Sequence, residues 1–327
     1  MASSRPRAFT FSQVGPYRLY STAELLAMPP PEWLIRDVLP MGELSVAYAP
    51  PESYKSFLGM DIALSVACGI PWQGKEMLTP GFVIYIAAEG VAGLGKRALA
   101  WFMEKGINPD TADVAWLTES LAVTADSDAL LHLLSRIEDE VKRVPVLIVI
   151  DTLARCFDGE ENETGDMAKF VAGCDVLRHK FGCAVLVIHH TRMDGSRERG
   201  NTALRGGSRM MMSLEKDSQS NSVTVTCTKM NDAEHFADMA LELKVVDLGI
   251  DHAGNPVTSC VLNGTDLAGK KTAQEEWLVS TLQDKGPLKW SAWMAATGYD
   301  ASLFPAVYQR IKGRVEKDPA TDLWRVK

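Results

Sequence analysis

The sequence predicts an α/β fold with a mostly parallel central sheet, followed by a small C-terminal domain. Strongly apolar segments of strand length alternate with amphipathic segments of helix length, which is typical of a parallel sheet covered by helices on both faces. Two later segments alternate polar and apolar residues with a period of two, as antiparallel strands do. After about residue 268 the pattern changes to short helices.

The expected elements begin after a proline-rich start. PPPEW at 29–33 prevents a helix because proline lacks the amide proton and fixes φ, so residues 1–30 are expected to form an N-terminal arm. Buried strands are expected at 42–49, 81–90, 144–152 and 183–191. Apolar residues at helical spacing predict helices at 55–69, 98–106, 128–143 and 165–182. Added antiparallel strands are expected at 222–230 and 239–250.

Residues 31–268 are expected to form this core, and residues 272–327 a winged-helix-like domain. Between them, LAGKKTAQ (267–274) resembles a linker. Helical patterns follow at 275–286, at 290–298 and within 299–318, and DLWRVK closes the chain as a short strand. Three helices and a strand in about 55 residues are typical of a winged helix.

The composition excludes several classes of protein. Hydrophobic residues make up 46% and charged residues 23% of the 327 residues, so the chain is globular rather than disordered or fibrous. No apolar run approaches the roughly 18–20 residues that cross a bilayer, and no secretory signal is expected. The six cysteines lack metal-ligand spacing, so we expect free thiols in a cytoplasmic protein. Because no apolar run is long enough to cross a bilayer, we expect no membrane partner. The net charge of −8 does not exclude a local basic loop.

The segment APPESYKSF (49–57) lies between a predicted strand and a predicted helix, where a phosphate-binding loop is expected. Lys55 would reach the β- and γ-phosphates, Ser56 would ligate Mg²⁺, and the helix N-terminus would supply amide donors. The match to GxxxxGK[ST] is imperfect, because Ala49 and Tyr54 replace glycines and two prolines remove amide protons. The alternative is an ordinary turn between a strand and a helix.

Two carboxylates stand at the ends of predicted strands, where open parallel sheets bind ligands. Asp151, after the apolar LIVI, would hold the Mg²⁺ shell through water, and Glu89 would orient and deprotonate the attacking water. The alternatives are a turn-capping aspartate and a surface glutamate. The candidate nucleotide-binding residues are therefore Pro50, Pro51, Glu52, Ser53, Tyr54, Lys55, Ser56, Phe57 and Asp151.

LVIHHT (186–191) places two histidines where the next strand ends. Their spacing suits neither a zinc site nor a Ser-His-Asp triad. We expect His190 to sense the γ-phosphate and His189 to pack beneath it, with a purely structural pair as the alternative.

The segment 192–209 that follows has five arginines, four glycines and two acidic residues. A mobile cationic loop after a phosphate sensor indicates a nucleic-acid contact, and the alternative is a solvated surface loop. Its candidate DNA-binding residues are Arg197, Arg199, Arg205 and Arg209, although the last two could instead face a neighbouring subunit. Lys229, at the end of a predicted edge strand, could reach a phosphate across a subunit interface.

The sequence resembles the RecA-like P-loop ATPases in an ordered set of short segments. These are APPESYKSF, YIAAEG, LIVIDT, VIHHT, ALRGGS and TKMND. Among these ATPases, the sequence is most similar to the RepA-type hexameric replicative helicases of plasmids and the related phage helicases. The similarity covers roughly residues 30–250. It implies a RecA-like core that assembles as a homo-oligomeric ring, with ATP and Mg²⁺ at subunit interfaces and single-stranded DNA in the channel. It also implies a phage-infected or bacterial cell and a separate primase or initiator.

The resemblance assigns roles by position. Lys55 and Ser56 match the phosphate-loop pair, and Glu89 matches the catalytic carboxylate. Asp151 matches the Walker B aspartate, and His190 matches the sensor residue.

Lys229 matches the first of two trans-acting fingers, whereas Asn231 stands in the second place. Three functions remain open, of which a strand-exchange recombinase has the least support in the sequence. The other two are a ring-shaped ATP-dependent DNA helicase or translocase and an ATPase module that binds DNA or a partner without unwinding.

Overall fold

The computed structural model describes residues 20–125, 127–161, 163–191, 202–217, 220–265, 267–301 and 303–327. The chain divides into two compact units, residues 1–32 and residues 33–327. The first unit contains the short helix α1 (Thr22–Leu26), which begins with a capping box. The Ser21 hydroxyl accepts a hydrogen bond from the Glu24 amide, and the Glu24 carboxylate accepts one from the Ser21 amide.

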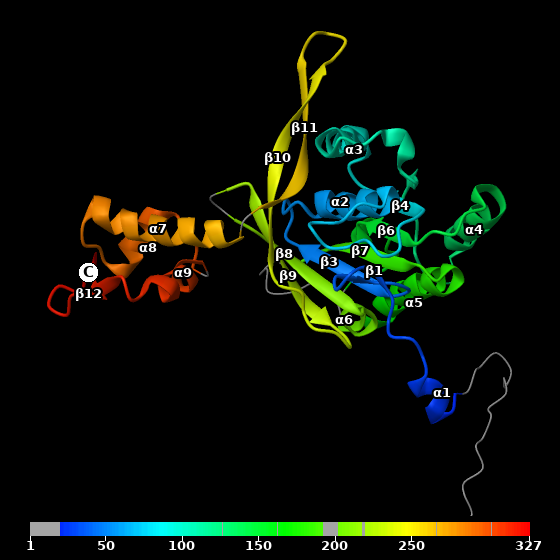
Figure 1. The fold of residues 1–327 in the computed structure, drawn as a ribbon, viewed down its shortest axis with the longest axis horizontal. Helices are drawn as coiled ribbons and strands as arrows, with labels where there is room; N and C mark the ends of the chain where they lie inside the picture. The colour runs from blue at the N-terminus through cyan, green and yellow to red at the C-terminus, as the bar shows by residue number, and fades with distance from the viewer. Residues whose placement is uncertain are drawn as a thin grey trace, which may run out of the picture. The chain divides into compact units, whose positions relative to one another are not determined.

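The second unit is built on a nine-stranded sheet (Figure 1). Its strands are β3 (Leu44–Ala49), β4 (Val83–Ala87), β5 (Val114–Leu117), β6 (Leu147–Asp151), β7 (Ala184–His190), β8 (Met210–Lys216), β9 (Ser222–Met230), β10 (Met239–Ile250) and β11 (Pro256–Thr265). The spatial order is β11-β10-β9-β8-β3-β7-β6-β4-β5. The six strands from β8 to β5 are parallel, and β9 to β11 extend the sheet antiparallel. The predicted fold class is confirmed, including the two added antiparallel strands.

Helices cover both faces of this sheet. They are α2 (Lys55–Cys68), α3 (Val91–Lys105), α4 (Asp128–Arg136, continued by a π-helical turn), α5 (Thr164–Phe181) and α6 (Thr202–Gly207). Figure 1 shows α2 and α3 on one face, and α5 and α6 on the other. Neighbouring strand residues face opposite cores: Val149 packs with α2 and α3, and Ile148 with α5. Because β4 and β6 are buried on both faces, they are apolar runs, apart from Asp151 at the end of β6.

A buried acid fixes α2 against its surroundings. Asp61 is 1% exposed, and its carboxylate accepts hydrogen bonds from the indoles of Trp72 and Trp101 and from the amide of Gln73, at 2.8, 2.7 and 2.7 Å. Burial raises the pKa of Asp61, and these hydrogen bonds oppose the rise. Three donors satisfy the carboxylate, so it orients α2 without leaving an unpaired buried group.

Residues 267–274, expected as a linker, begin the continuous helix α7 (Leu267–Lys285), since alanine, lysine and glutamine favour helix. Their role as a linker stays a prediction. A second prediction, of an irregular loop, is wrong in part. The predicted loop at 192–209 contains α6, anchored by the fully buried Leu204. Residues 192–201 of that segment lie outside the described residues.

The C-terminal segment continues with α8 (Trp290–Thr297), α9 (Leu303–Ile311) and the antiparallel pair β12 (Val315–Lys317) and β13 (Trp324–Val326). It has its own hydrophobic cluster, in which Leu278, Trp293, Phe304 and Ile311 are fully buried. The winged-helix assignment stays a prediction.

A two-stranded sheet pairs β1 (Trp33–Ile35) with β2 (Leu39–Pro40). Within the residues described above, no helix combines the length and the apolar character needed to cross a membrane.

Candidate nucleotide-binding site

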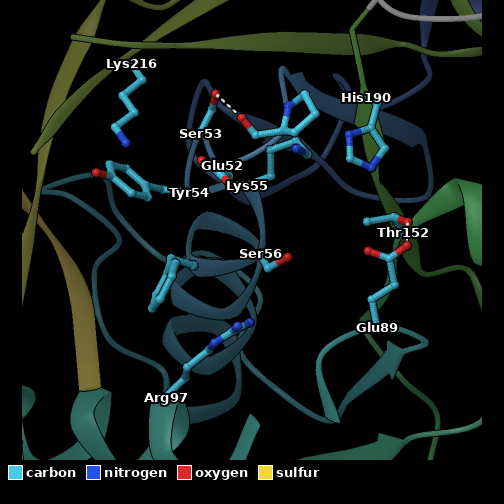
Figure 2. Close-up of a pocket in the computed structure, with 12 residues that line it drawn as sticks. Glu52, Ser53, Tyr54, Lys55, Ser56, Glu89, Arg97, Thr152, His190 and Lys216 are labelled. Atoms are coloured by element: carbon cyan, nitrogen blue, oxygen red, sulfur yellow. Dashed lines mark hydrogen bonds between the residues drawn. The ribbon is translucent and has the colours of Figure 1, made fainter. Parts of the chain in front are cut away.

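The carboxyl ends of β3, β7, β6 and β4 meet at one edge of the sheet. In the parallel register Ala49 lies opposite His190, and Ala87 lies opposite Asp151. The segments that follow these strand ends surround a cavity of about 460 Å³ (Figure 2). It is lined by Pro51, Glu52, Ser53, Tyr54, Lys55, Ser56, Phe57, Glu89, Arg97, Thr152, His190 and Lys216. The volume lies within the range of small-molecule sites.

The predicted phosphate loop forms one side of this cavity. Lys55 starts α2, is 6% exposed, and donates from Nζ to the Pro50 carbonyl at 2.8 Å. No side chain caps the α2 N-terminus at Tyr54, so the first amides of the helix are available to an anion. Burial lowers the pKa of the Lys55 ammonium, and the carboxylates of Asp151 and Glu89 act in the opposite direction. A bound polyphosphate would supply Lys55 with the negative partner that this environment favours.

Tyr54 takes the backbone conformation that the missing glycine would have supplied. Its φ of 64° and ψ of 19° lie in the left-handed region, which costs a residue other than glycine of order 1–3 kcal/mol. Two contacts hold its ring: the Lys216 ammonium lies 4.7 Å from the ring centroid, and the Phe57 ring packs edge-on at 6.4 Å. The loop therefore keeps its backbone course although the glycine is replaced.

Ser56 and Asp151 form the oxygen donor set for a cation. The Ser56 hydroxyl donates to Asp151 Oδ1 at 3.0 Å, and the Tyr85 hydroxyl donates to Asp151 Oδ2 at 2.7 Å. Burial raises the pKa of Asp151, and these two hydrogen bonds oppose the rise. Gly59 allows this approach of α2, because a Cβ there would lie 3.2 Å from the Tyr85 hydroxyl and 3.1 Å from Ile188. A hydroxyl beside a buried carboxylate fits Mg²⁺, which prefers oxygen ligands.

Glu89 lies on the other side of the cavity from the phosphate loop. Its Oε1 accepts hydrogen bonds from Thr152 Oγ1 at 3.3 Å and from Arg155 Nε at 3.0 Å. Figure 2 shows Glu89 and Thr152 facing each other. Because Arg155 is largely exposed, its ion pair with Glu89 contributes little and can be exchanged for a water contact.

The two histidines lie in different surroundings. The His190 side chain lines the cavity, and Figure 2 shows it on the same side as Glu89 and Thr152. His189 is fully buried in the sheet. These positions suit a sensor at 190 above a packing residue at 189, and the sensor role stays a prediction.

Sequence reasoning missed four residues around the cavity. Arg97, on α3, places its guanidinium 5.0 Å from the Phe57 ring centroid, and Lys216 comes from the end of β8. Thr152 and Arg155 hold Glu89. Only Thr152 had a usable signal, since it directly follows Asp151. The other three belong to elements without a motif, and the fold alone brings them to the site.

Three predicted residues lie away from the cavity. Lys229 Nζ donates to the carbonyls of Arg205 and Ser208, both at 2.5 Å, and so caps the carboxyl end of α6. Arg205 donates to the Thr228 carbonyl at 3.0 Å, and Arg209 pairs with Asp232 at 2.6 Å. These contacts tie α6 to β9.

The trans-acting role of Lys229 stays a prediction, as do DNA contacts by Arg205 and Arg209. Arg197 and Arg199 lie outside the described residues.

Comparison with known families identifies the part of the chain that carries this site. Residues 21–196 match the model of a family described as an AAA domain, and they make up more than half of the chain. The chain belongs to the AAA-domain family. This AAA domain contains the phosphate loop, Glu89, Asp151 and His190, and every residue that lines the cavity belongs to it except Lys216.

Among solved structures, this AAA-domain protein is similar to a crystal structure of the RadB recombinase. The two sequences are 15% identical, and the match covers 63% of this chain and 89% of that chain with a TM-score of 0.47.

Proposed function

We propose that this protein is an ATP-dependent DNA helicase or translocase that acts as a ring on single-stranded DNA. The proposal of ATP hydrolysis rests on the placement of Glu89 across the cavity from Lys55. Beside Lys55, the Ser56 hydroxyl is hydrogen-bonded to the Asp151 carboxylate. A base, a phosphate-binding cation and an oxygen donor pair are the groups that phosphoryl transfer to water requires.

Each group has a defined task in hydrolysis. Glu89 takes a proton from water as the water oxygen bonds to the γ-phosphorus and the bond to the β–γ bridging oxygen breaks. Lys55 and the α2 amides stabilise the charge on the phosphate oxygens. Ser56 and Asp151 would hold Mg²⁺, which when bound neutralises charge on the phosphates. Thr152 orients the Glu89 carboxylate through its 3.3 Å hydrogen bond.

The DNA part of the proposal rests on how the basic segment is attached to the nucleotide site. That segment begins directly after Thr191, whose amide donates to the Ala49 carbonyl at 3.1 Å. At its other end, Arg205 donates to the Thr228 carbonyl, and the Thr228 hydroxyl accepts from the Tyr48 hydroxyl at 3.1 Å. Both ends of the segment therefore contact β3, directly or through one residue, just before the phosphate loop. This supports a DNA-binding segment whose position depends on the bound nucleotide.

The proposed type of helicase and its assembly follow from the resemblance of the sequence motifs to RepA-type helicases. We propose a RepA-like hexamer of a phage or plasmid replication system, with ATP at subunit interfaces and a separate primase or initiator. The test combines a DNA-stimulated ATPase assay, unwinding of a forked duplex, and electron microscopy with and without an ATP analogue and single-stranded DNA. Rings, stimulation and directional unwinding are expected. ATP binding without rings or unwinding would instead support the non-translocating ATPase module.

Replacing Arg197 and Arg199 with Ala should weaken DNA binding and make it less dependent on salt. Each phosphate contact on a single strand contributes about −0.7 to the slope of log K against log salt, so losing two should make the slope shallower by about 1.4. Fluorescence anisotropy of a labelled oligonucleotide at several salt concentrations measures this. Arg136→Ala is the control, because Arg136 pairs with Glu140 on α4 and does not line the cavity. An unchanged slope would move the DNA site elsewhere. The next candidates are basic residues of the C-terminal segment, namely Lys289, Arg310, Lys312 and Arg314.

Mixing two inactive variants tests the shared site. Lys55→Ala subunits mixed with Lys229→Ala subunits should regain partial ATPase activity, because an intact loop and an intact finger then meet at some interfaces. Since Lys229 also caps α6, thermal melting and assembly of Lys229→Ala are measured first. Co-assembly without recovery at any mixing ratio would leave Lys229 with a structural role only.

A further inference from the structure

The wall of the cavity opposite Glu89 is aromatic and cationic. Figure 2 shows Tyr54 and Lys216 on one side of Lys55, and Glu89, Thr152 and His190 on the other. The Lys216 ammonium lies 4.7 Å from the centroid of the Tyr54 ring, and both side chains line the cavity. The hydrolysis described above makes no use of either side chain.

The two walls fix the direction in which a nucleotide lies. Water attacks the terminal phosphate, so that phosphate must lie near Glu89. Lys55 and Ser56, in the middle, take the phosphates that follow. The nucleoside end then lies on the side of Tyr54 and Lys216.

We infer that Tyr54 and Lys216 bind the base of the nucleotide, an inference that rests on the proposed nucleotide site. The half-buried Tyr54 ring lines the cavity, and the face that Lys216 does not cover would stack on the π-face that every base has. The Lys216 ammonium has three donors and no acceptor, and every base carries ring nitrogens or carbonyls that accept. Neither contact distinguishes one base from another.

The backbone at residue 54 adds a second reason. A tyrosine at φ 64° occupies a conformation that glycine adopts without strain, so the backbone course of the loop does not require a ring at this position. The ring instead adds an aromatic surface beside the phosphate site, next to Phe57, which also lines the cavity. Tyr54, which weakens the match to the phosphate-loop motif, thereby contributes to binding the base.

The experiment compares Mg²⁺-ATP with Mg²⁺-tripolyphosphate, which has the phosphates but no base. Calorimetry measures both affinities for the full chain and for Tyr54→Gly, Tyr54→Phe and Lys216→Met. Tyr54→Gly keeps the left-handed backbone accessible and removes the ring, so it should lower the ratio of ATP affinity to tripolyphosphate affinity by roughly tenfold, the size of a base–aromatic stack. Tyr54→Phe keeps the stacking face and should keep the ratio. Lys216→Met should lower it several-fold, and GTP should bind the parent within a few-fold of ATP.

The outcomes separate two failures. If the parent binds neither ATP nor tripolyphosphate, the proposed nucleotide site is wrong. If both bind and the ratio is unchanged in Tyr54→Gly, the site stands and the base-binding wall is wrong. If Lys216→Met weakens ATP and tripolyphosphate equally, Lys216 contacts phosphate and its assignment to the base is overturned.

Discussion

We expect Lys55→Ala to abolish ATP hydrolysis and to weaken nucleotide binding. Lys55 is the charged group at the first turn of α2, and only 6% of it is exposed, so water replaces it poorly. Loss of a preorganised charge-stabilising donor costs at least about 10²–10³-fold in turnover, and here a full positive charge is lost with it. Steady-state phosphate release measures the rate, and binding of a fluorescent ATP analogue measures the affinity.

The control for this variant is Lys169→Ala, which removes a surface lysine that pairs with Asp166 on α5. It should hydrolyse ATP at the parental rate. A Lys55→Ala protein as active as the parent would exclude this loop as the nucleotide site, and with it the base-binding role of Tyr54.

We expect Glu89→Gln to retain ATP binding and to lose turnover by roughly 10²–10⁴-fold, the usual effect of removing a general base. Glutamine keeps the shape of the side chain and an oxygen that accepts from Thr152, so the cavity is preserved. It cannot take the proton of the attacking water. Single-turnover hydrolysis separates this loss of chemistry from a change in ATP binding or product release.

Glu140→Gln serves as its control, because Glu140 is an exposed partner of Arg136 on α4. Thr152→Val provides a graded comparison, since it keeps the base and removes the 3.3 Å hydrogen bond that orients it. A Glu89→Gln protein that no longer binds ATP would reassign Glu89 to shaping the site.

The fold and the first half of the site were predictable because their signals are local. Strands β4 and β6 are buried on both faces and are therefore almost continuous apolar runs, and the acidic residues at or just after their ends mark the ligand edge of the sheet. Strand β5 was missed because it is a four-residue edge strand with only half-buried side chains. Strand β8 was missed because three methionines after a glycine-rich segment carry no periodicity.

The second half of the site was not predictable in this way. Arg97 and Lys216 reach the cavity from a helix face and a strand end, and Arg155 contacts Glu89 from a short 3-10 helix. No local spacing in the sequence marks these three residues. The capping of α6 by Lys229 likewise depends on β9 lying beside that helix. Contacts between elements distant in sequence are set by the packed fold, so a motif search finds the loop and misses what surrounds it.

The position of β3 in the sheet has a consequence for how the protein is made. β3 is the earliest of the nine strands to be synthesised, yet its two neighbours are β7 and β8, far along the chain. At 5–20 residues per second, a ribosome needs on the order of 10 s to go from one to the other. During that time the six residues of β3, all of which are buried in the folded protein, have no neighbouring strands to pair with. Exposed apolar segments of a nascent chain are prone to aggregation and favour chaperone binding. Strand β3, which leads into the phosphate loop, is thus synthesised first but pairs with its neighbours late. Bound ATP can therefore stabilise the nascent chain only after β7 and β8 have left the ribosome.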